Sequence, residues 1–186
     1  MSLRPLLLLT LAALAVVLAG CGNKSAIVTS AKTEGIYLDV GQLKYQVQMS
    51  RILNPNDEED RTYLAGLPAG TAQPTGAEAW FGVWMRVQNV HSKKTRAAAK
   101  DFSITDTQGH RFTPVTLTNN PFAYAAQDLP PRTIVPTPNS AAGEGVQQGS
   151  LILFKVTTEA LANRPLEFKI QSPALPDDVG VVDLDV

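Results

Sequence analysis

The sequence predicts an all-β fold, either a β-sandwich or a β-barrel, and three observations support this prediction. At least six short segments are alternately apolar and polar or continuously apolar, and turn signals separate them. The chain has 13 Gly and 13 Pro, which suit a fold with many turns. No segment carries the long apolar repeat of period 3.6 that an amphipathic helix requires.

The clearest predicted strand covers residues 42–50, where apolar and polar residues alternate with period two. Its buried face is expected to carry Leu43, Tyr45, Val47 and Met49. A turn signal containing Asn and Pro ends the strand, and residues 55–77 are expected to form a long loop. The acidic run 57–60 at its start lacks the alternating spacing of a calcium loop, which favours solvated acids over metal ligands.

A second strand is predicted over residues 78–89. Its odd-numbered residues, from Ala79 to Val87, make one apolar face, whereas Trp80, Trp84 and Arg86 share the other face. Two interpretations of the tryptophans stay open. The long loop or a later Pro-rich segment covers them as a minor core, or they form an exposed aromatic platform, with Arg86 beside it, for a glycan, a peptide or a partner protein.

The rest of the chain continues the pattern of short strands and turns. A β-hairpin is predicted over 102–112 with Gly109 in its turn, followed by an extended, Pro-rich stretch over 114–139. The remaining predicted elements are a strand over 149–156, one helical turn at 158–161, a strand over 166–170 and a last strand over 182–186.

The first 20 residues have the pattern of a secretory signal peptide. Arg4 provides a positive charge, and the apolar run that follows is roughly 14 residues, or about 21 Å as a helix. This is short of the ~30 Å hydrocarbon core of a bilayer, so a cleaved signal is favoured over a transmembrane helix.

The apolar run ends in Leu-Ala-Gly-Cys, which resembles the bacterial lipobox. The resemblance implies cleavage between Gly20 and Cys21, a thioether-linked diacylglycerol on Cys21 and, in some lipoproteins, a third, N-linked acyl chain such as palmitate. Two chains suffice for stable anchoring to a membrane. Residues 21–33 are small and polar and are expected to be a flexible tether. The sequence therefore predicts an extracytoplasmic domain held at the bacterial membrane by lipid.

The strand patterns at 79–89, 102–106, 149–156 and 164–170 resemble the telokin-like domain of unknown function found behind the lipobox of many bacterial lipoproteins. The resemblance implies an immunoglobulin-like antiparallel β-sandwich of about seven strands over residues 34–171. Residues 172–186 would then be an acidic C-terminal tail or an extra strand. The family offers no established active-site residues to carry over.

Composition and motifs argue against several function classes. The formal net charge is −1, which provides no electrostatic basis for binding nucleic acid. The Ser-hydrolase motif Gly-x-Ser-x-Gly is absent, and Cys21, the one cysteine, is assigned to lipid. His91 and His110 lack zinc-ligand spacing and are interpreted as solvated loop residues, with a weak surface metal pair as the alternative. We therefore expect no enzyme, no metal and no cofactor besides the covalent lipid.

Two non-enzymatic functions remain as hypotheses. The first is an interaction module, displayed on a lipid anchor, that binds another envelope protein or a cell-wall polymer through its loops and edge strands. The alternative is a carrier or chaperone of a small apolar envelope ligand, which would require an apolar cavity between the sheets.

Overall fold

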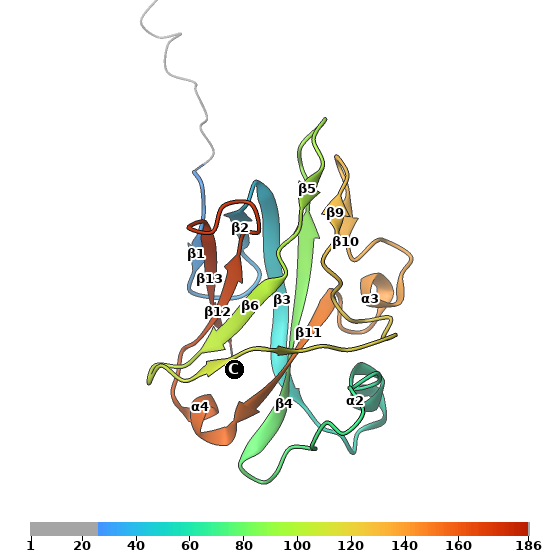
Figure 1. The fold of residues 1–186 in the computed structure, drawn as a ribbon, viewed down its shortest axis with the longest axis vertical. Coiled ribbons are helices and arrows are strands. Elements are labelled where there is room, and N and C mark those ends of the chain that lie inside the picture. The colour runs from blue at the N-terminus through green and yellow to red at the C-terminus, as the bar shows by residue number, and fades with distance from the viewer. Residues whose placement is uncertain (1–25, 186) are drawn as a thin grey trace, which may run out of the picture.

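The computed structural model describes residues 26–185, which fold into a β-sandwich (Figure 1). The predicted signal peptide, its cleavage site and Cys21 lie outside these residues. One sheet has the strand order β2-β3-β4-β11-β8, with β10 also paired to β4, and the other has the order β1-β13-β12-β6-β7. The prediction of an all-β sandwich is confirmed.

The first sheet is built on two strands of 11 residues, β3 (Leu43–Leu53) and β4 (Glu78–Gln88). They are flanked by β2 (Tyr37–Val40), β10 (Ile134–Val135), β11 (Ser150–Thr157) and β8 (Pro114–Val115). Strand β4 is buried on both faces, because Phe81, Val83 and Met85 point into the space between the sheets while the tryptophans point away from it into a second apolar cluster.

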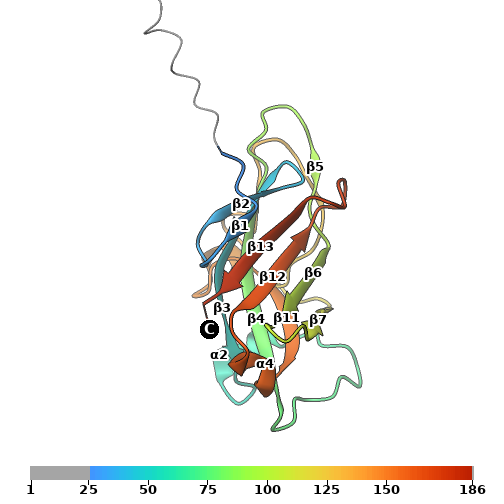
Figure 2. The ribbon, with the colours of Figure 1, turned by 90° about the vertical axis from the view of Figure 1, so that its left-hand side faces the viewer.

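The second sheet contributes the opposite half of the main core (Figure 2). Its central strands are β6 (Asp101–Thr105), β12 (Leu166–Gln171) and β13 (Val179–Leu184). Phe168 of β12 stacks on Phe102 with ring centroids 5.7 Å apart and meets the edge of Phe154 from the first sheet. Residues 179–184 therefore form a strand of the sandwich. Of the two expectations for the C-terminal segment, an acidic tail or an extra strand, the structure has the strand.

The sandwich begins earlier than the sequence predicts, because β1 (Ser30–Ala31) pairs in parallel with β13. Ala31 is buried in the main core, and Thr33 donates a hydrogen bond of 2.6 Å to the carboxylate of Asp185. Residues 30–33 thus belong to the fold, so the predicted tether over 21–33 is too long at its C-terminal side. The period-two signal is weak in a strand of two residues, which explains the error.

Strand β3 contains a β-bulge between Val47 and Met49 that the sequence pattern does not reveal. The bulge inserts one residue and reverses which residues face the main core. Met49 therefore lies opposite Trp84 on the outer face, contrary to the prediction, and Ser50 points inward opposite Val83. The buried Ser50 backbone N–H donates to the carboxylate of Glu34 at 3.1 Å.

Other predicted elements are confirmed. The 102–112 hairpin is formed by β6 and β7 (Arg111–Phe112), and Gly109 has the positive φ of 88° that its turn requires. The helical turn after β11 is α4 (Thr158–Ala162), with the Thr157 hydroxyl accepting from the Ala160 N–H. The Pro-rich stretch contains no helix and forms only the short strands β8, β9 (Asp128–Leu129) and β10. A helix of one turn, α3 (Ala141–Glu144), follows it.

The sandwich has two ends with different loops. At the N-terminal end the described chain begins, and this end carries the turn at 41–42 and the loops 89–95, 129–133 and 172–178 (Figures 1 and 2). Two of these loops meet through the small sheet of β5 (Arg96–Ala97) and β9 (Asp128–Leu129). The opposite end carries α2 (Glu58–Tyr63), α4 and the β6–β7 turn.

Candidate functional site

Trp80 and Trp84 are both buried, with 1% and 0% of their surfaces exposed. They belong to a second apolar cluster on the outer face of the first sheet. We call it the minor core; its buried members are Leu53, Tyr63, Leu64, Trp80, Trp84, Leu151 and Leu153. The exposed aromatic platform is therefore not present, and the alternative of a covered minor core is confirmed. Arg86 on the same face is half-buried and donates to Gln148 Oε1 at 3.4 Å.

The cover is α2, within the segment 55–77 that the sequence analysis expects to be a loop throughout. Asp57 caps the helix, because its Oδ1 accepts from the N–H groups of Glu59 and Asp60 at 3.0 and 3.1 Å. The following acids fill the first turn, where the helix dipole favours negative charge. An Asp followed by a run of acids is a helix-start signal, so this pattern could have predicted α2.

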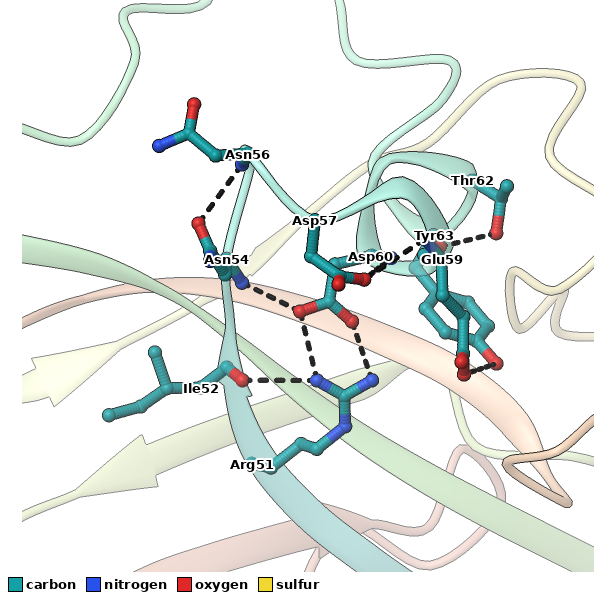
Figure 3. A network of polar contacts seen from close by, with 9 residues as sticks. All are labelled: Arg51, Ile52, Asn54, Asn56, Asp57, Glu59, Asp60, Thr62 and Tyr63. Carbon is teal, nitrogen blue, oxygen red and sulfur yellow. Dashed lines mark hydrogen bonds and ion pairs between the residues drawn. The ribbon is translucent and has the colours of Figure 1, made fainter.

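An ion pair fastens α2 to the sheet (Figure 3). The two guanidinium nitrogens of Arg51 on β3 each contact one carboxylate oxygen of Asp60, with Nη1 and Oδ2 3.0 Å apart. Asp60 Oδ2 also accepts from the Asn54 N–H at 2.7 Å. This two-pronged geometry is the strongest form of Arg–carboxylate contact. It makes Asp60 the structural centre of the cover, whereas the sequence analysis expects a solvated acid at this position.

The charges of this pair shift the protonation equilibria of both partners. Burial alone would raise the pKa of Asp60, but the hydrogen bonds from Arg51 and Asn54 and the guanidinium charge bring it below its ordinary value. The hydrogen bond to Asp60 raises the pKa of Arg51 further. Both groups are therefore ionised near neutral pH. The guanidinium also lies over the Trp84 ring, with Cζ 5.3 Å from the centroid, which adds a cation–π contact.

Aromatic packing and a second set of hydrogen bonds hold the cover from its other side. Tyr63 of α2 meets the Trp84 ring edge-on at 5.3 Å and Phe122 at 4.9 Å. Asn120 donates to the carbonyls at the end of α2, including Tyr63 O at 3.0 Å and Ala65 O at 2.8 Å. The Pro-rich stretch therefore fixes the C-terminus of α2 while Arg51 fixes its first turn.

A groove lies beside this cover on the surface of the molecule, with a volume of about 530 Å³. Its lining residues come from the segments before and after α2 and from the helix itself: Pro55, Asn56, Arg61, Leu64, Leu67, Gln73 and Pro74. Gln73 of the groove lining is tied to the minor core, because the Trp80 Nε1–H donates to its Oε1 at 3.3 Å. The site is thus an apolar and amide surface with one exposed cation, Arg61, on a rigid support.

A smaller hollow of about 150 Å³ opens at the edge of the first sheet between β8 and residues 123–126. Its walls include Phe102, Tyr124 and Ile152, and Lys100 lies at its rim. An apolar void of about this volume takes a ligand the size of benzene, which is far smaller than an acyl chain. Aromatic and aliphatic side chains fill the space between the two sheets, where the carrier hypothesis requires a cavity.

The two histidines lie at opposite ends of the sandwich, so they do not form the surface pair that the sequence analysis kept as an alternative. His91 Nδ1 accepts from the Lys93 N–H at 3.3 Å at the N-terminal end. His110 Nδ1 lies 2.8 Å from the buried Asp106 in the β6–β7 turn. Across residues 26–185, no three His, Cys, Asp or Glu side chains gather as a metal site.

Comparisons with known proteins support the fold. No protein-family profile matches the chain, and no curated protein matches it either. The solved structure of yjhA from Bacillus subtilis is similar with a TM-score of 0.52 and 12% identity, over 83% of this chain and 99% of that one. At this identity the similarity concerns the fold alone.

Two further solved structures are more distant. The ycdA protein of Bacillus subtilis, described as a candidate lipoprotein, has a TM-score of 0.47 and 8% identity over 79% of this chain and 38% of that chain. An uncharacterized β-sandwich protein from Clostridium difficile has a TM-score of 0.45 and 7% identity, over 88% and 99% of the two chains. Within residues 26–185, no helix has the length and apolar character needed to span a bilayer.

Proposed function

We propose that this chain is an extracytoplasmic lipoprotein whose β-sandwich, of the telokin-like kind, is a non-enzymatic interaction module. In this proposal Cys21 carries the diacylglycerol that holds the domain at the membrane. The groove beside α2 binds a segment of another envelope protein. The signal-peptide pattern and the lipobox resemblance support the anchor, and the geometry of the groove supports the binding surface.

The observation that carries the binding surface is the construction of the α2 cover. Residues 64–77, which join α2 to β4, contain no helix or strand, and connections of this length without secondary structure are uncommon in a compact domain and are often functional. A helix of 6 residues has little stability alone, so it is held by the ion pair, the aromatic contacts and the Asn120 hydrogen bonds. A surface that is fixed before binding loses less entropy on association.

The lining of the groove fits a protein segment better than a sugar polymer. Leu64, Leu67 and two prolines provide apolar contacts, and Gln73 provides an amide next to them. An exposed aromatic face, which the sequence analysis considered for a glycan, is not available because both tryptophans are buried. Arg61 at the rim favours a partner segment with an acidic residue.

The anchor and the binding surface are tested separately. Mass spectrometry of the mature N-terminal peptide should find diacylglycerol on Cys21, and Cys21→Ala should release the protein from the membrane fraction. A photo-crosslinking amino acid at Gln73, which is exposed, should capture one envelope protein reproducibly in cells. The paired substitution Arg61→Ala/Leu67→Ser should abolish this capture.

The control is the same crosslinker at Arg111, an exposed residue of the β6–β7 hairpin outside the groove. Capture of the same protein from both positions, or unchanged capture by the groove variant, would contradict the groove as the binding site. Substituting Trp80 or Trp84 is unsuitable as a binding test, because removing a buried tryptophan side chain costs about 3–5 kcal/mol of stability.

A further inference from the structure

Three exposed cations gather at the N-terminal end of the sandwich. Lys93 and Lys94 lie on the loop after β4, and Arg132 lies on the loop between β9 and β10. None of the three has an ion-pair partner among the residues that the structure describes. The segments 90–95 and 130–133, which we call the basic loops, contain no acidic residue. Val90, with 56% of its surface exposed, adds an apolar side chain beside them.

Asn89 holds the two basic loops together from inside. This side chain is fully buried, and its amide nitrogen donates to Lys94 O at 2.8 Å in one loop and to Pro130 O at 3.1 Å in the other. Its Oδ1 accepts from the His91 N–H at 3.0 Å. The Arg132 N–H donates to His91 O at 3.2 Å. The cations are thus fixed on one surface and do not move apart as independent loops would.

The backbone at Arg132 supports the importance of its side chain. Its φ of 57° lies in the left-handed region, where Gly or Asn is the usual residue. An arginine at this position has a backbone cost that a glycine would not have. A residue with this backbone cost is expected where its side chain has a function, and the exposed guanidinium of Arg132 can provide one as a cation for binding.

The basic loops lie at the end of the domain where the described chain begins (Figure 1). The described chain starts at Ala26 and is tied to β2 two residues later, where the Val28 N–H donates to Asp39 at 3.0 Å. Four residues lie between Cys21 and Ala26, so the five Cα–Cα steps between them span at most about 18 Å. A lipid on Cys21 would therefore hold this end within a short distance of the headgroups.

We infer that the basic loops rest on anionic phospholipid headgroups of the membrane in which Cys21 is anchored. This inference rests on the proposed function, because without the anchor the loops have no surface close by. Two acids at the same end, Asp177 and Asp178, lie on the loop between β12 and β13, and the exposed Asp128 lies on β9 next to the second basic loop. The three cations of the basic loops outnumber Asp128, so the side of β4 and β10 is net positive and the domain tilts toward that side. The α2 groove, at the opposite end, faces away from the membrane.

The test uses the acylated full-length protein, purified from membranes and reconstituted into vesicles of phosphatidylcholine alone or of an equimolar mixture with phosphatidylglycerol. Amide hydrogen exchange is measured for the basic loops and for residues 58–77. A basic residue near an anionic surface contributes a factor of about five in binding. Exchange in the basic loops should therefore be at least about five-fold slower on the vesicles that contain phosphatidylglycerol than on phosphatidylcholine vesicles. Exchange in residues 58–77 should be the same on both.

In the variant Lys93→Gln/Lys94→Gln/Arg132→Gln, the basic loops should exchange on both kinds of vesicle at the rate measured on phosphatidylcholine vesicles. The matched control removes three exposed arginines away from this end and should keep the protection: Arg61→Gln/Arg111→Gln/Arg164→Gln. Equal exchange on both vesicles, protection that survives the first set of substitutions, or protection lost in the control would overturn the inference. If one of these three results is obtained with protein whose Cys21 carries lipid, the proposed anchor stands and only the inference fails. If Cys21 is found unmodified, both the anchor and the inference fail.

Discussion

Substituting Asp60 should loosen the α2 cover by an amount that the structure allows us to work out. Asp60→Ala removes the acceptor of two guanidinium hydrogen bonds and of the Asn54 N–H. Breaking a fully buried ion pair costs about 3–5 kcal/mol, because one charge is left without a partner. The Arg51 side chain is 28% exposed, so water recovers part of this loss. We expect a destabilisation of about 2–3 kcal/mol, or a fall in Tm of about 4–12 °C for a domain of this size.

Tryptophan fluorescence is the suitable assay, because the chain has 2 tryptophans and both are buried in the minor core. Thermal unfolding followed by fluorescence therefore reports directly on the region under α2. The control is Lys32→Ala, which breaks the pair with Asp183 in which the lysine side chain is 85% exposed. This substitution should change stability by no more than about 1 kcal/mol.

A double substitution separates charge pairing from simple loss of contacts. Arg51→Met/Asp60→Leu removes both charges together, and such apolar replacements of buried pairs are often neutral or stabilising. The double variant should therefore be more stable than Asp60→Ala. A fall in Tm below about 2 °C for Asp60→Ala, or a double variant as unstable as the single one, would refute the reasoning.

Two other substitutions test the packing and the electrostatics. Gly82→Ala would place a Cβ 2.6 Å from Trp84 Cη2, so we expect chemical denaturation to show a free energy of unfolding that is lower by about 1–3 kcal/mol. In the control Gly76→Ala the added Cβ meets nothing, and the free energy of unfolding should not fall. Equal values for the two variants would contradict the close packing at Gly82. The hydrogen bond and charge of Asp106 raise the pKa of His110 above 6.5. The stability that the His110–Asp106 pair adds to the folded state is therefore complete below pH 6.5 and is lost as the pH rises through the raised pKa. His110→Gln should therefore lose less Tm than the unsubstituted protein between neutral and alkaline pH, and parallel Tm profiles would show that the pair does not contribute.

The two sheets could be predicted from the sequence because their strands are long or strongly patterned. The apolar face of β4 from Phe81 to Val87 and the alternation of β12 both follow from side chains that point to opposite faces at successive positions. The same rule predicts that Trp80 and Trp84 share a face. It does not reveal what lies over that face, since the covering residues are distant in sequence and are placed by tertiary contacts.

Strand β3 shows why the minor core was harder to predict than the main core. Strict alternation puts Met49 on the main-core face, but the bulge after Val47 shifts every later residue to the other face. The shift brings Met49 and Arg51 onto the outer face beside Trp84. Without it, Arg51 would point toward the main core, where Asp60 could not reach it. The bulge is therefore what makes the ion pair, and with it the fixed position of α2, geometrically available.

The arrangement of the charged residues links the two proposals. The Arg51–Asp60 pair is used internally, so its charges hold α2 and are not free for a partner. Among the cations of residues 26–185 that form no ion pair, Arg61 lies beside the groove at one end and those of the basic loops lie at the other. If the basic loops contact the membrane, the groove is held at the far end of the domain, where a partner in the envelope can reach it. A domain that bound with its groove toward the membrane would have to lift the basic loops away from the lipid, so the two contacts favour one orientation.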